Sequence, residues 1–338
     1  MTERINIGVI GAGRIGRLHA ENLAWHIPEA NLVAVADVVV QAAQKCAATL
    51  GIPAAYSDYR AILDDAKIDA VAICSSTDTH SQIIEEAAKA GKHIFCEKPI
   101  DHDLQRIDRA LGAVKQSGVK LQIGFNRRFD PSFRRARALV AEGKIGQPHV
   151  VRITSRDPAP PPVEYIKVSG GIFLDMTIHD FDMARFVIGS EVEEVYAIGA
   201  VLVDPRIGQA GDLDTILVTL RYANGALGSI DNSRQAVYGY DQRVEVFGSA
   251  GNVAVANHTP DNAVYSSADG VHSALPLHFF LERYTAAYIA EMREFIACVL
   301  QDKAPSVSGI DGRIPVVMGL AAWKSYRERR PVKLSEIG

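Results

Sequence analysis

The chain has little of several features that mark specialised classes of protein. Its four cysteines (Cys46, Cys74, Cys96 and Cys298) lack the close spacing of metal ligands, and its net charge of −4 does not favour nucleic acid or an anionic membrane as a partner. No apolar run approaches the roughly 18 residues of a membrane span. The N-terminus passes from Met-Thr-Glu-Arg into a strand-like run, which predicts no secretion signal. We therefore expect a soluble protein of the reducing cytoplasm.

What the chain does contain is enough apolar sequence for two domains. Hydrophobic residues make up 48% of 338 residues, typical of a globular enzyme. The first part alternates helix-like stretches with short apolar runs at Ile5–Ile10, Leu32–Ala36, Ala70–Cys74, His93–Cys96 and Leu121–Phe125. Such alternation predicts an α/β fold, with a doubly wound parallel sheet covered on both faces. We assign this Rossmann-type domain to residues 1–124.

The second part, residues 125–338, has a different texture. Alternating runs follow closely at Val195–Val203, Thr215–Tyr222, Ala226–Asp231, Arg243–Phe247 and Val253–Ala256, with turns such as Asn224-Gly225 between them. These features predict an antiparallel sheet in a second α/β domain. Two helices, near Glu282–Leu300 and Arg313–Arg327, close the chain, and the last of them can pack back on the first domain.

The first motif is the glycine run Gly11-Ala-Gly-Arg-Ile-Gly16. It follows a strand, opens a helix and precedes an acidic residue, Asp37, which is the context of a dinucleotide-binding turn. Gly11 permits the tight turn, Gly13 lets backbone approach a pyrophosphate, and Gly16 allows close packing of helix on strand. We expect the turn, including Arg14 and Ile15, to bind the cofactor.

Asp37 ends the second strand-like run and predicts the type of cofactor. Its carboxylate can accept hydrogen bonds from both ribose hydroxyls, but it would repel a 2′-phosphate. Val38 and Val39 supply no compensating cation. We predict NAD rather than NADP.

Two further groups follow strand-like runs, at the carboxyl ends where this type of sheet binds ligands. Ser75 and Ser76 either line the nicotinamide or ribose side or cap the next helix. Lys98 can donate to a substrate hydroxyl and stabilise a developing alkoxide, with Glu97 beside the cofactor. Taken alone, such a lysine is more often a solvated charge.

Asp175, His179 and Asp182 have the spacing i, i+4, i+7, so we expect them to share one face of a helix. His179 can take the hydroxyl proton while Asp175 orients its imidazole, and Asp182 can accept a second hydroxyl. A solvated surface stripe is the plain alternative. The same spacing can hold a divalent metal, but no cysteine or second histidine joins it, so we predict no metal.

With these residues identified, the chain resembles the glucose–fructose oxidoreductase/inositol dehydrogenase/rhizopine catabolism (Gfo/Idh/MocA) family over essentially its whole length, and is most similar to bacterial inositol 2-dehydrogenases. The resemblance is carried by GAGRIG, CEKP, GFNRRFDP at Gly124–Pro131, SRDP at Ser155–Pro158, GGIFLDMTIHDFDMARF and YGYDQR at Tyr238–Arg243.

The resemblance implies a Rossmann domain followed by a domain whose large open sheet often mediates a homotetramer. It implies that Lys98, Asp175 and His179 are catalytic, and that Asn126, Arg127, Asp182 and Tyr240 contact a cyclitol. Asp157 is a further candidate for binding substrate hydroxyls. Two positions depart from the pattern of some inositol dehydrogenases, which carry histidine in place of Ser155 and threonine in place of Met176. These departures bear on which polyol is preferred.

The expected activity is NAD-dependent oxidation of myo-inositol to 2-keto-myo-inositol (scyllo-inosose). Dehydrogenation of scyllo-inositol, another polyol or a pyranose sugar is the nearest alternative. A 2-hydroxy acid is less favoured, although Arg127 can clamp a carboxylate. A non-enzymatic NAD-sensing regulator is the rival from another class, because a fold alone does not establish catalysis.

Overall fold

A computed structural model describes residues 4–338, which divide into two compact units. Unit 1 comprises the residues up to Phe129 together with Ala286–Val316, and unit 2 comprises Asp130–Thr285 and the residues from Val317 onward. The division along the chain lies five residues beyond the expected 124/125 boundary. A second difference is that a later segment, Ala286–Val316, belongs to unit 1.

Unit 1 contains a six-stranded sheet, and all of its strand pairs are parallel. The order β3-β2-β1-β4-β5-β6 is that of a dinucleotide-binding Rossmann sheet. Its elements are β1 (Ile5–Ile10), α1 (Arg14–His26), β2 (Ala30–Ala36), α2 (Val40–Leu50), β3 (Ala54–Tyr56), α3 (Arg60–Leu63), β4 (Ala70–Ile73), α4 (Thr77–Lys89), β5 (His93–Glu97), α5 (Leu104–Ser117), β6 (Leu121–Gly124), η1 (Asn126–Phe129) and α12 (Thr285–Leu300), which belongs to unit 1 from Ala286.

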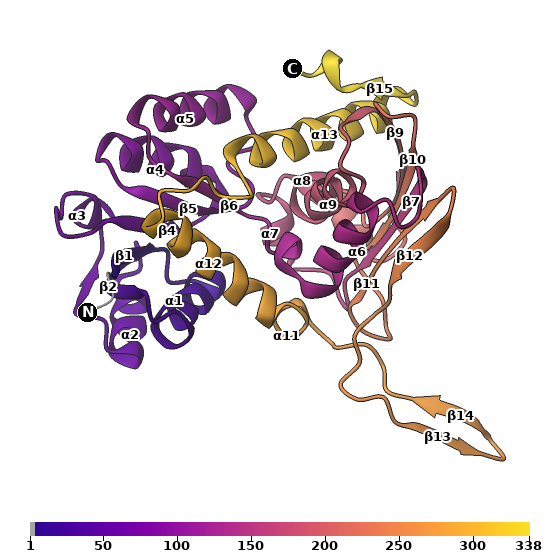
Figure 1. Cartoon of the computed structure of the whole chain (residues 1–338), viewed down its shortest axis with the longest axis horizontal. Helices are drawn as coiled ribbons and strands as arrows, with labels where there is room; N and C mark the ends of the chain where they lie inside the picture. The colour runs from indigo at the N-terminus through magenta and orange to yellow at the C-terminus, as the bar shows by residue number, and fades with distance from the viewer. Residues whose placement is uncertain (1–3) are drawn as a thin grey trace. The chain divides into compact units, whose positions relative to one another are not determined.

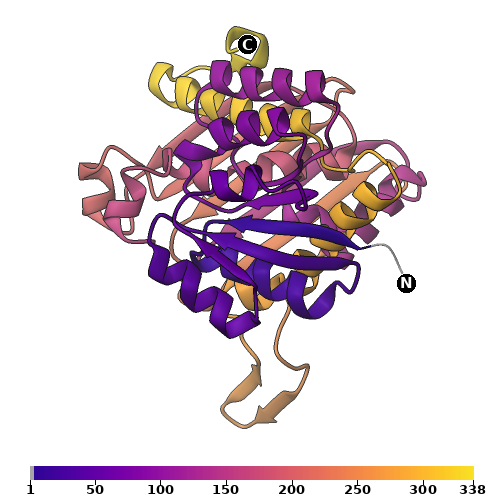
Figure 2. The same ribbon diagram turned by 90° about the vertical axis from the view of Figure 1, so that its left-hand side faces the viewer.

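The predicted parallel sheet is confirmed, with helices on both of its faces. Figures 1 and 2 show α1 and α2 on one side of the strands and α4 and α5 on the other. Sequence patterns missed β3, which has only three residues and no fully buried position. An edge strand this short carries too little periodicity to be recognised.

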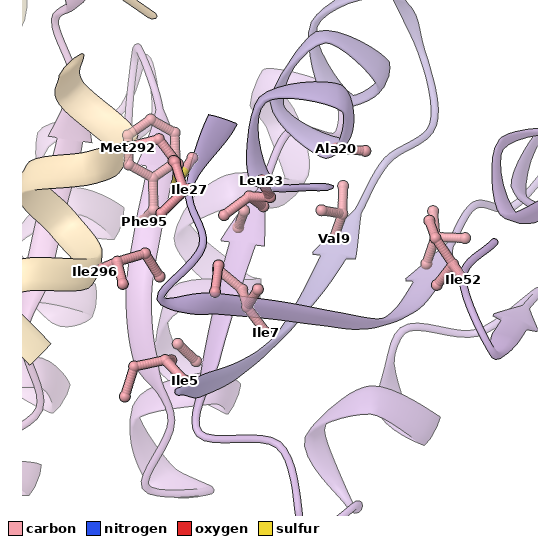
Figure 3. Close-up of a cluster of buried hydrophobic side chains, with 14 of the residues drawn as sticks. Ile5, Ile7, Val9, Ala20, Leu23, Ile27, Ile52, Phe95, Met292 and Ile296 are labelled. Atoms are coloured by element: carbon pink, nitrogen blue, oxygen red, sulfur yellow. The ribbon is translucent and has the colours of Figure 1, made fainter. Parts of the chain in front are cut away.

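The core of unit 1 joins segments that lie far apart in the sequence. Ile7 and Val9 of β1, Leu23 of α1 and Phe95 of β5 are buried together with Met292 of α12 (Figure 3). The apolar residues of β1 are buried on both faces, as expected of a central parallel strand. Helix α12 is therefore part of the first core, although almost 190 residues separate it from β5.

Unit 2 contains a seven-stranded sheet in the order β12-β11-β7-β10-β9-β8-β15. Only β7 and β10 pair in parallel, which confirms the expected mostly antiparallel sheet. Its elements are α6 (Pro131–Ala141), β7 (Pro148–Arg156), α7 (Val163–Ile166), α8 (Gly171–Asp175), α9 (Ile178–Ile188), β8 (Val192–Ala200), α10 (Pro205–Gln209), β9 (Thr215–Tyr222), β10 (Leu227–Ser233), β11 (Asp241–Gly248), β12 (Gly251–Val255), β13 (Val264–Ser267), β14 (Gly270–Ser273), α11 (Phe280–Arg283), β15 (Val332–Lys333) and η2 (Leu334–Glu336). Helix α13 (Gly309–Glu328) contributes residues to both units.

One face of this sheet is covered by helices. Along β9 buried and exposed residues alternate, and the buried Tyr222 donates a hydrogen bond to the Ala184 carbonyl of α9, over 3.1 Å. Leu217, on the opposite face of the same strand, is exposed. The strands β13 and β14 form a separate hairpin that extends away from the sheet of unit 2 (Figure 1).

Two expected helices differ from those observed. The segment predicted as Glu282–Leu300 is divided, because α11 ends at Arg283 and α12 begins at Thr285. Helix α13 begins four residues before the expected Arg313 and contains Pro315. Within residues 4–338, no helix combines the length and apolar character needed to cross a bilayer.

Candidate active site

The glycine turn has the geometry that a phosphate cradle requires. Gly11 adopts a φ of +99°, and a Cβ there would lie 2.6 Å from the Cys74 carbonyl carbon. A Cβ on Gly16 would lie 1.8 Å from the Gly11 carbonyl oxygen, so α1 contacts the turn directly. A Cβ on Gly13 would meet no atom within 4 Å. Gly13 therefore leaves open space at the N-terminus of α1, where backbone N–H groups can bind a pyrophosphate.

A cavity of about 360 Å³ opens beside this turn, at the carboxyl ends of β1, β2 and β4. Strands β1 and β4 are neighbours at which the strand order reverses, and sheets of this type bind ligands at that position. Five of the predicted cofactor residues line the cavity: Gly11, Gly13, Asp37, Ser75 and Ser76. Of the other residues of the turn, Gly16 packs beneath Gly11, Arg14 is exposed and Ile15 is half-buried.

Asp37 is held at the end of β2 by two backbone donors. Its Oδ2 accepts a hydrogen bond from the Ala12 N–H at 2.7 Å, and its Oδ1 accepts one from the Val39 N–H at 2.8 Å. The first of these bonds joins Asp37 to the glycine turn. The carboxylate retains further lone pairs for ribose hydroxyls.

Ser57 and Tyr59, which no sequence pattern indicated, also line the cavity. Both follow the short strand β3, so the only available signal was a polar pair after an unrecognised strand. Burial and a 2.9 Å hydrogen bond to Glu86 raise the pKa of Tyr59 to about 12. Tyr59 is therefore a neutral phenol at physiological pH.

Ser76 is the N-cap residue of α4, but its hydroxyl makes no capping hydrogen bond. The Ser75 hydroxyl instead shares a 2.7 Å hydrogen bond with Thr79. Capping therefore does not account for either side chain, and both remain candidates for contact with a cofactor.

Lys98 follows β5 directly and is half-buried, and its peptide bond to Pro99 is cis. One ring nitrogen of the buried His80 lies 2.8 Å from the Pro99 carbonyl, and the other lies 3.0 Å from the Ser75 carbonyl. His80 therefore connects the loop of Lys98 to the rim of the cavity. Glu97 Oε1 lies 2.7 Å from His19 Nε2.

In unit 2, the expected single helix carrying Asp175, His179 and Asp182 is interrupted. Helix α8 ends at Asp175 and α9 begins at Ile178, and the Thr177 N–H donates to Ile172, five residues earlier. Asp175 and His179 are half-buried, whereas Asp182 is fully buried. The prediction of one uninterrupted helix was wrong.

The interruption has a tertiary cause. The Thr177 hydroxyl donates to the Asn232 side chain at 2.6 Å, and the Asn232 amide donates to Asp180 at 2.9 Å and to the Ser155 carbonyl at 3.3 Å. Asn232 lies on β10, so the start of α9 is attached to the sheet. Spacing along the sequence does not reveal such an attachment.

Asp175 lies between two partners that its sequence spacing did not indicate. Its carboxylate accepts hydrogen bonds from the Tyr165 hydroxyl at 2.8 Å and from the Arg234 guanidinium at 3.2 Å. Arg234 is fully buried, and its second Nη lies 3.5 Å from the Asp212 carboxyl group. Burial raises the pKa of Asp212. The Arg234 guanidinium and the Tyr165 phenol therefore orient the carboxylate of Asp175, which lies four residues before His179.

The remaining predicted residues belong to different units. Asn126 and Arg127 lie buried in η1 of unit 1. Asp157 follows β7 in unit 2 and is half-buried, and the Tyr240 ring packs edge-on against Tyr284, with 6.0 Å between the ring centroids. Ser155, one of the two atypical positions, is fully buried and donates to the Gln242 side chain at 2.9 Å.

In the described part of the chain, one group of side chains has the spacing of metal ligands. It consists of His19, Glu97 and Glu291, whose ligand atoms all lie within 4.8 Å of one another, and it does not include the Asp175 stripe.

Comparisons with known proteins cover nearly the whole chain. Residues 5–125 match the family model described as "Oxidoreductase family, NAD-binding Rossmann fold", and residues 133–254 match the "GFO/IDH/MocA C-terminal domain". The chain is 53% identical to the myo-inositol 2-dehydrogenase of Thermotoga maritima, covering 98% of this chain and 99% of that protein. It is 48% identical to an inositol 2-dehydrogenase of Rhizobium meliloti, with the same coverage.

Solved structures also match nearly the whole chain. A probable dehydrogenase from Thermotoga maritima superimposes with a TM-score of 0.97 at 52% identity, covering 99% of this chain and 100% of that one. A scyllo-inositol dehydrogenase from Lactobacillus casei, with bound NAD(H) and scyllo-inositol, superimposes with a TM-score of 0.92 at 32% identity, covering 98% and 100%.

Proposed function

The chain belongs to the GFO/IDH/MocA oxidoreductase family, and from that premise we propose that it oxidises myo-inositol to 2-keto-myo-inositol with reduction of NAD. Membership makes it an NAD-dependent dehydrogenase acting on a CH–OH group. The choice of substrate is carried by the 53% identity, over nearly the whole of both chains, to a protein named myo-inositol 2-dehydrogenase. Family membership also favours an enzyme over an NAD-sensing regulator.

In the proposed reaction, the carbinol carbon gives a hydride to the nicotinamide while its hydroxyl gives a proton to His179. The C–H and O–H bonds break, a C=O bond forms, and NAD⁺ becomes NADH. Asp175 orients His179 and stabilises its protonated form, and its own bonds to Tyr165 and Arg234 support that role. A positioned base contributes about 10²–10⁴ in rate.

Lys98 is assigned the polarisation of the reacting oxygen, because an ammonium favours a developing alkoxide. The contacts of His80 to Pro99 and Ser75 support a fixed position of Lys98 relative to the cofactor cavity within unit 1. Glu97, the residue before Lys98, is assigned to cofactor binding.

The other hydroxyls of a cyclitol need polar partners, since each one desolvated without a partner costs about 1–3 kcal/mol. We assign this role to five side chains in addition to the catalytic ones: Asn126, Arg127, Asp157, Asp182 and Tyr240. Four of them are buried, and Asp157 is half-buried.

The test is NADH formation by the purified chain with myo-inositol, scyllo-inositol or glucose at equal concentrations. We expect the highest kcat/KM with myo-inositol. His179→Gln should lower kcat by about 10²–10⁴ and leave NAD binding unchanged, whereas His272→Gln on the exposed β14 strand should behave as wild type. Turnover of none of the three polyols would exclude the cyclitol assignment. A His179→Gln enzyme with full activity would exclude the proposed base.

Oxidation of scyllo-inositol is the second candidate, because the Lactobacillus casei structure that carries this name matches over almost the whole chain. The same panel decides between the two candidates. A higher kcat/KM with scyllo-inositol would replace the first assignment, and a preference for glucose would point to a pyranose dehydrogenase.

We also propose that the protein is a homotetramer of the cytoplasm. The uncovered face of the unit 2 sheet supports self-association, because Ile198 and Leu217 pair across β8 and β9 and are both about half exposed. Leu227 on β10 and Phe247 on β11 of the same sheet are exposed to about the same degree. Light scattering of the purified protein measures its mass in solution, and a monomer would exclude the tetramer.

A further inference from the structure

Unit 1 contains a buried group of three titratable side chains from three distant segments, one of which is the residue before Lys98. His19 lies on α1, Glu97 ends β5 and Glu291 lies on α12. His19 Nε2 lies 2.7 Å from Glu97 Oε1 and 4.0 Å from Glu291 Oε1. The side chains of His19 and Glu291 are fully buried, and that of Glu97 is 12% exposed. We call these residues the buried triad.

The surroundings of the triad are apolar. The His19 ring packs edge-on against Phe95 and Tyr288, with centroids 4.9 and 5.7 Å apart. Met292, next to Glu291 on α12, belongs to the apolar core of unit 1 (Figure 3). Phe295, one turn further along the helix, belongs to the same core. A carboxylate buried among apolar side chains loses its hydration, and those side chains cannot donate the hydrogen bonds that would replace the water.

The carboxyl groups of Glu97 and Glu291 differ in the polar contacts that can stabilise a negative charge. Glu97 has His19 on one oxygen, and its other oxygen accepts a 3.3 Å hydrogen bond from the Lys98 N–H. Both carboxyl oxygens of Glu291 are buried, and neither has a hydrogen-bond partner. The Gln122 amide beside α12 donates to the Glu291 backbone carbonyl, not to its carboxyl group.

Two carboxyl groups this close do not both ionise readily, and a proton bound by the pair goes to the worse-solvated member. Burial, and then the charge of Glu97, raise the pKa of Glu291 well above the ordinary value. Burial also raises the pKa values of the nearby Cys74 and Cys96 thiols, with Glu97 contributing to both. These thiols are therefore neutral. Lys98, the residue after Glu97, is a charged side chain directly next to a member of the triad in the sequence.

We propose that Glu291 is an uncharged carboxylic acid, and that together with His19 it fixes the carboxyl group of Glu97 beside Lys98. Glu291 and His19 are then positioning residues for the catalytic lysine. Gly124 leaves the space that the Glu97 carboxyl group occupies, because a Cβ at position 124 would lie only 3.1 Å from the Glu97 Cδ. The consequence for catalysis rests on the proposed role of Lys98, whereas the protonation of Glu291 does not.

The direct test is the infrared band of a protonated carboxyl group in the ligand-free protein near neutral pH, identified by its shift in D₂O. We expect a buried acid band that disappears in Glu291→Gln and persists in Glu29→Gln, which changes an exposed glutamate. A band that persists in Glu291→Gln, or no band in the wild type, would overturn the assignment. A stoichiometric metal ion in the purified protein that is lost in Glu291→Gln would also overturn it.

The positioning role is tested by rescue with an isostere of the neutral acid. Glu291→Ala should lower kcat/KM for NAD by about tenfold, and Glu291→Gln should restore it to within about twofold. Equal loss in both variants would show that a charge is needed and refute the neutral acid. If Glu291→Ala does not fold, the infrared band and the activity of Glu291→Gln alone still decide. The band needs no substrate, so failure to oxidise a cyclitol leaves this test intact.

Discussion

Replacing Gly16 by alanine tests whether the glycine turn depends on direct contact between helix and turn. The added Cβ would lie 1.8 Å from the Gly11 carbonyl oxygen and 2.8 Å from its carbon, and both are backbone atoms. Ordinary contact begins near 3.4 Å, so α1 must move away from the turn by more than an ångström. Overpacking of this kind costs about 1–3 kcal/mol. We expect the free energy of unfolding to fall by that amount and NAD binding to weaken as well.

Gly13→Ala is the matched control, three residues before Gly16. A Cβ there meets no atom within 4 Å, and the φ of −68° is one that alanine adopts readily. Its free energy of unfolding should stay within about 1 kcal/mol of the wild type. NAD binding should nevertheless weaken, because the Cβ fills the space open to the pyrophosphate.

Urea unfolding, followed by circular dichroism, measures the stability of both variants, and calorimetric titration with NAD measures their affinity. The two changes should separate: Gly16→Ala lowers stability and affinity, whereas Gly13→Ala lowers affinity alone. Equal stability of the two variants would refute the steric argument for Gly16. Unchanged affinity of Gly13→Ala would refute the position assigned to the pyrophosphate.

Three further predictions concern individual polar groups. Because the pKa of Glu291 is raised in the folded protein, the contribution of this group to stability is complete below the ordinary glutamate pKa and is lost as pH rises through the folded pKa. Between these two pKa values the free energy of unfolding of the wild type should fall by about 1.4 kcal/mol per pH unit relative to that of Glu291→Gln. Urea-unfolding free energies that run parallel with pH in the two proteins would contradict this. Asp37→Ser should lower kcat/KM for NAD by about tenfold or more and raise that for NADP, since it removes the ribose acceptor and its charge; an unchanged ratio of the two constants would exclude the role. Tyr222→Phe removes the buried bond to the Ala184 carbonyl and should cost about 1 kcal/mol in urea unfolding, with no loss if the bond is unimportant.

The parts of the site that sequence patterns predicted are local. The turn from Gly11 to Gly16 and Asp37 are separated by one helix and one strand, and both line or support the same cavity. Most strands of the second sheet were also recognised, and Thr215–Tyr222 agrees exactly with β9, because its alternation of buried and exposed residues is visible in the sequence. In each case the information lies within about 25 residues.

The parts that sequence patterns missed depend on chain segments that meet only after folding. Arg234 pairs with Asp175 across 59 residues, and Asn232 reaches Thr177 across 55. The interruption between α8 and α9 follows from such contacts. No periodicity marks a single buried arginine or asparagine, because its partner is set by how the sheet and helices pack.

Local sequence accounts for the dinucleotide turn, the acidic residue at the end of β2 and the alternation that builds each sheet, because sterics and hydrophobic periodicity act between near neighbours along the chain. The return of α12 to the core of unit 1, which places Glu291 beside His19 and Glu97, follows instead from the packing of distant segments. That placement depends on the summed burial of many apolar side chains across the unit. The chemical state of one carboxyl group is therefore set by packing that no single segment of the chain encodes.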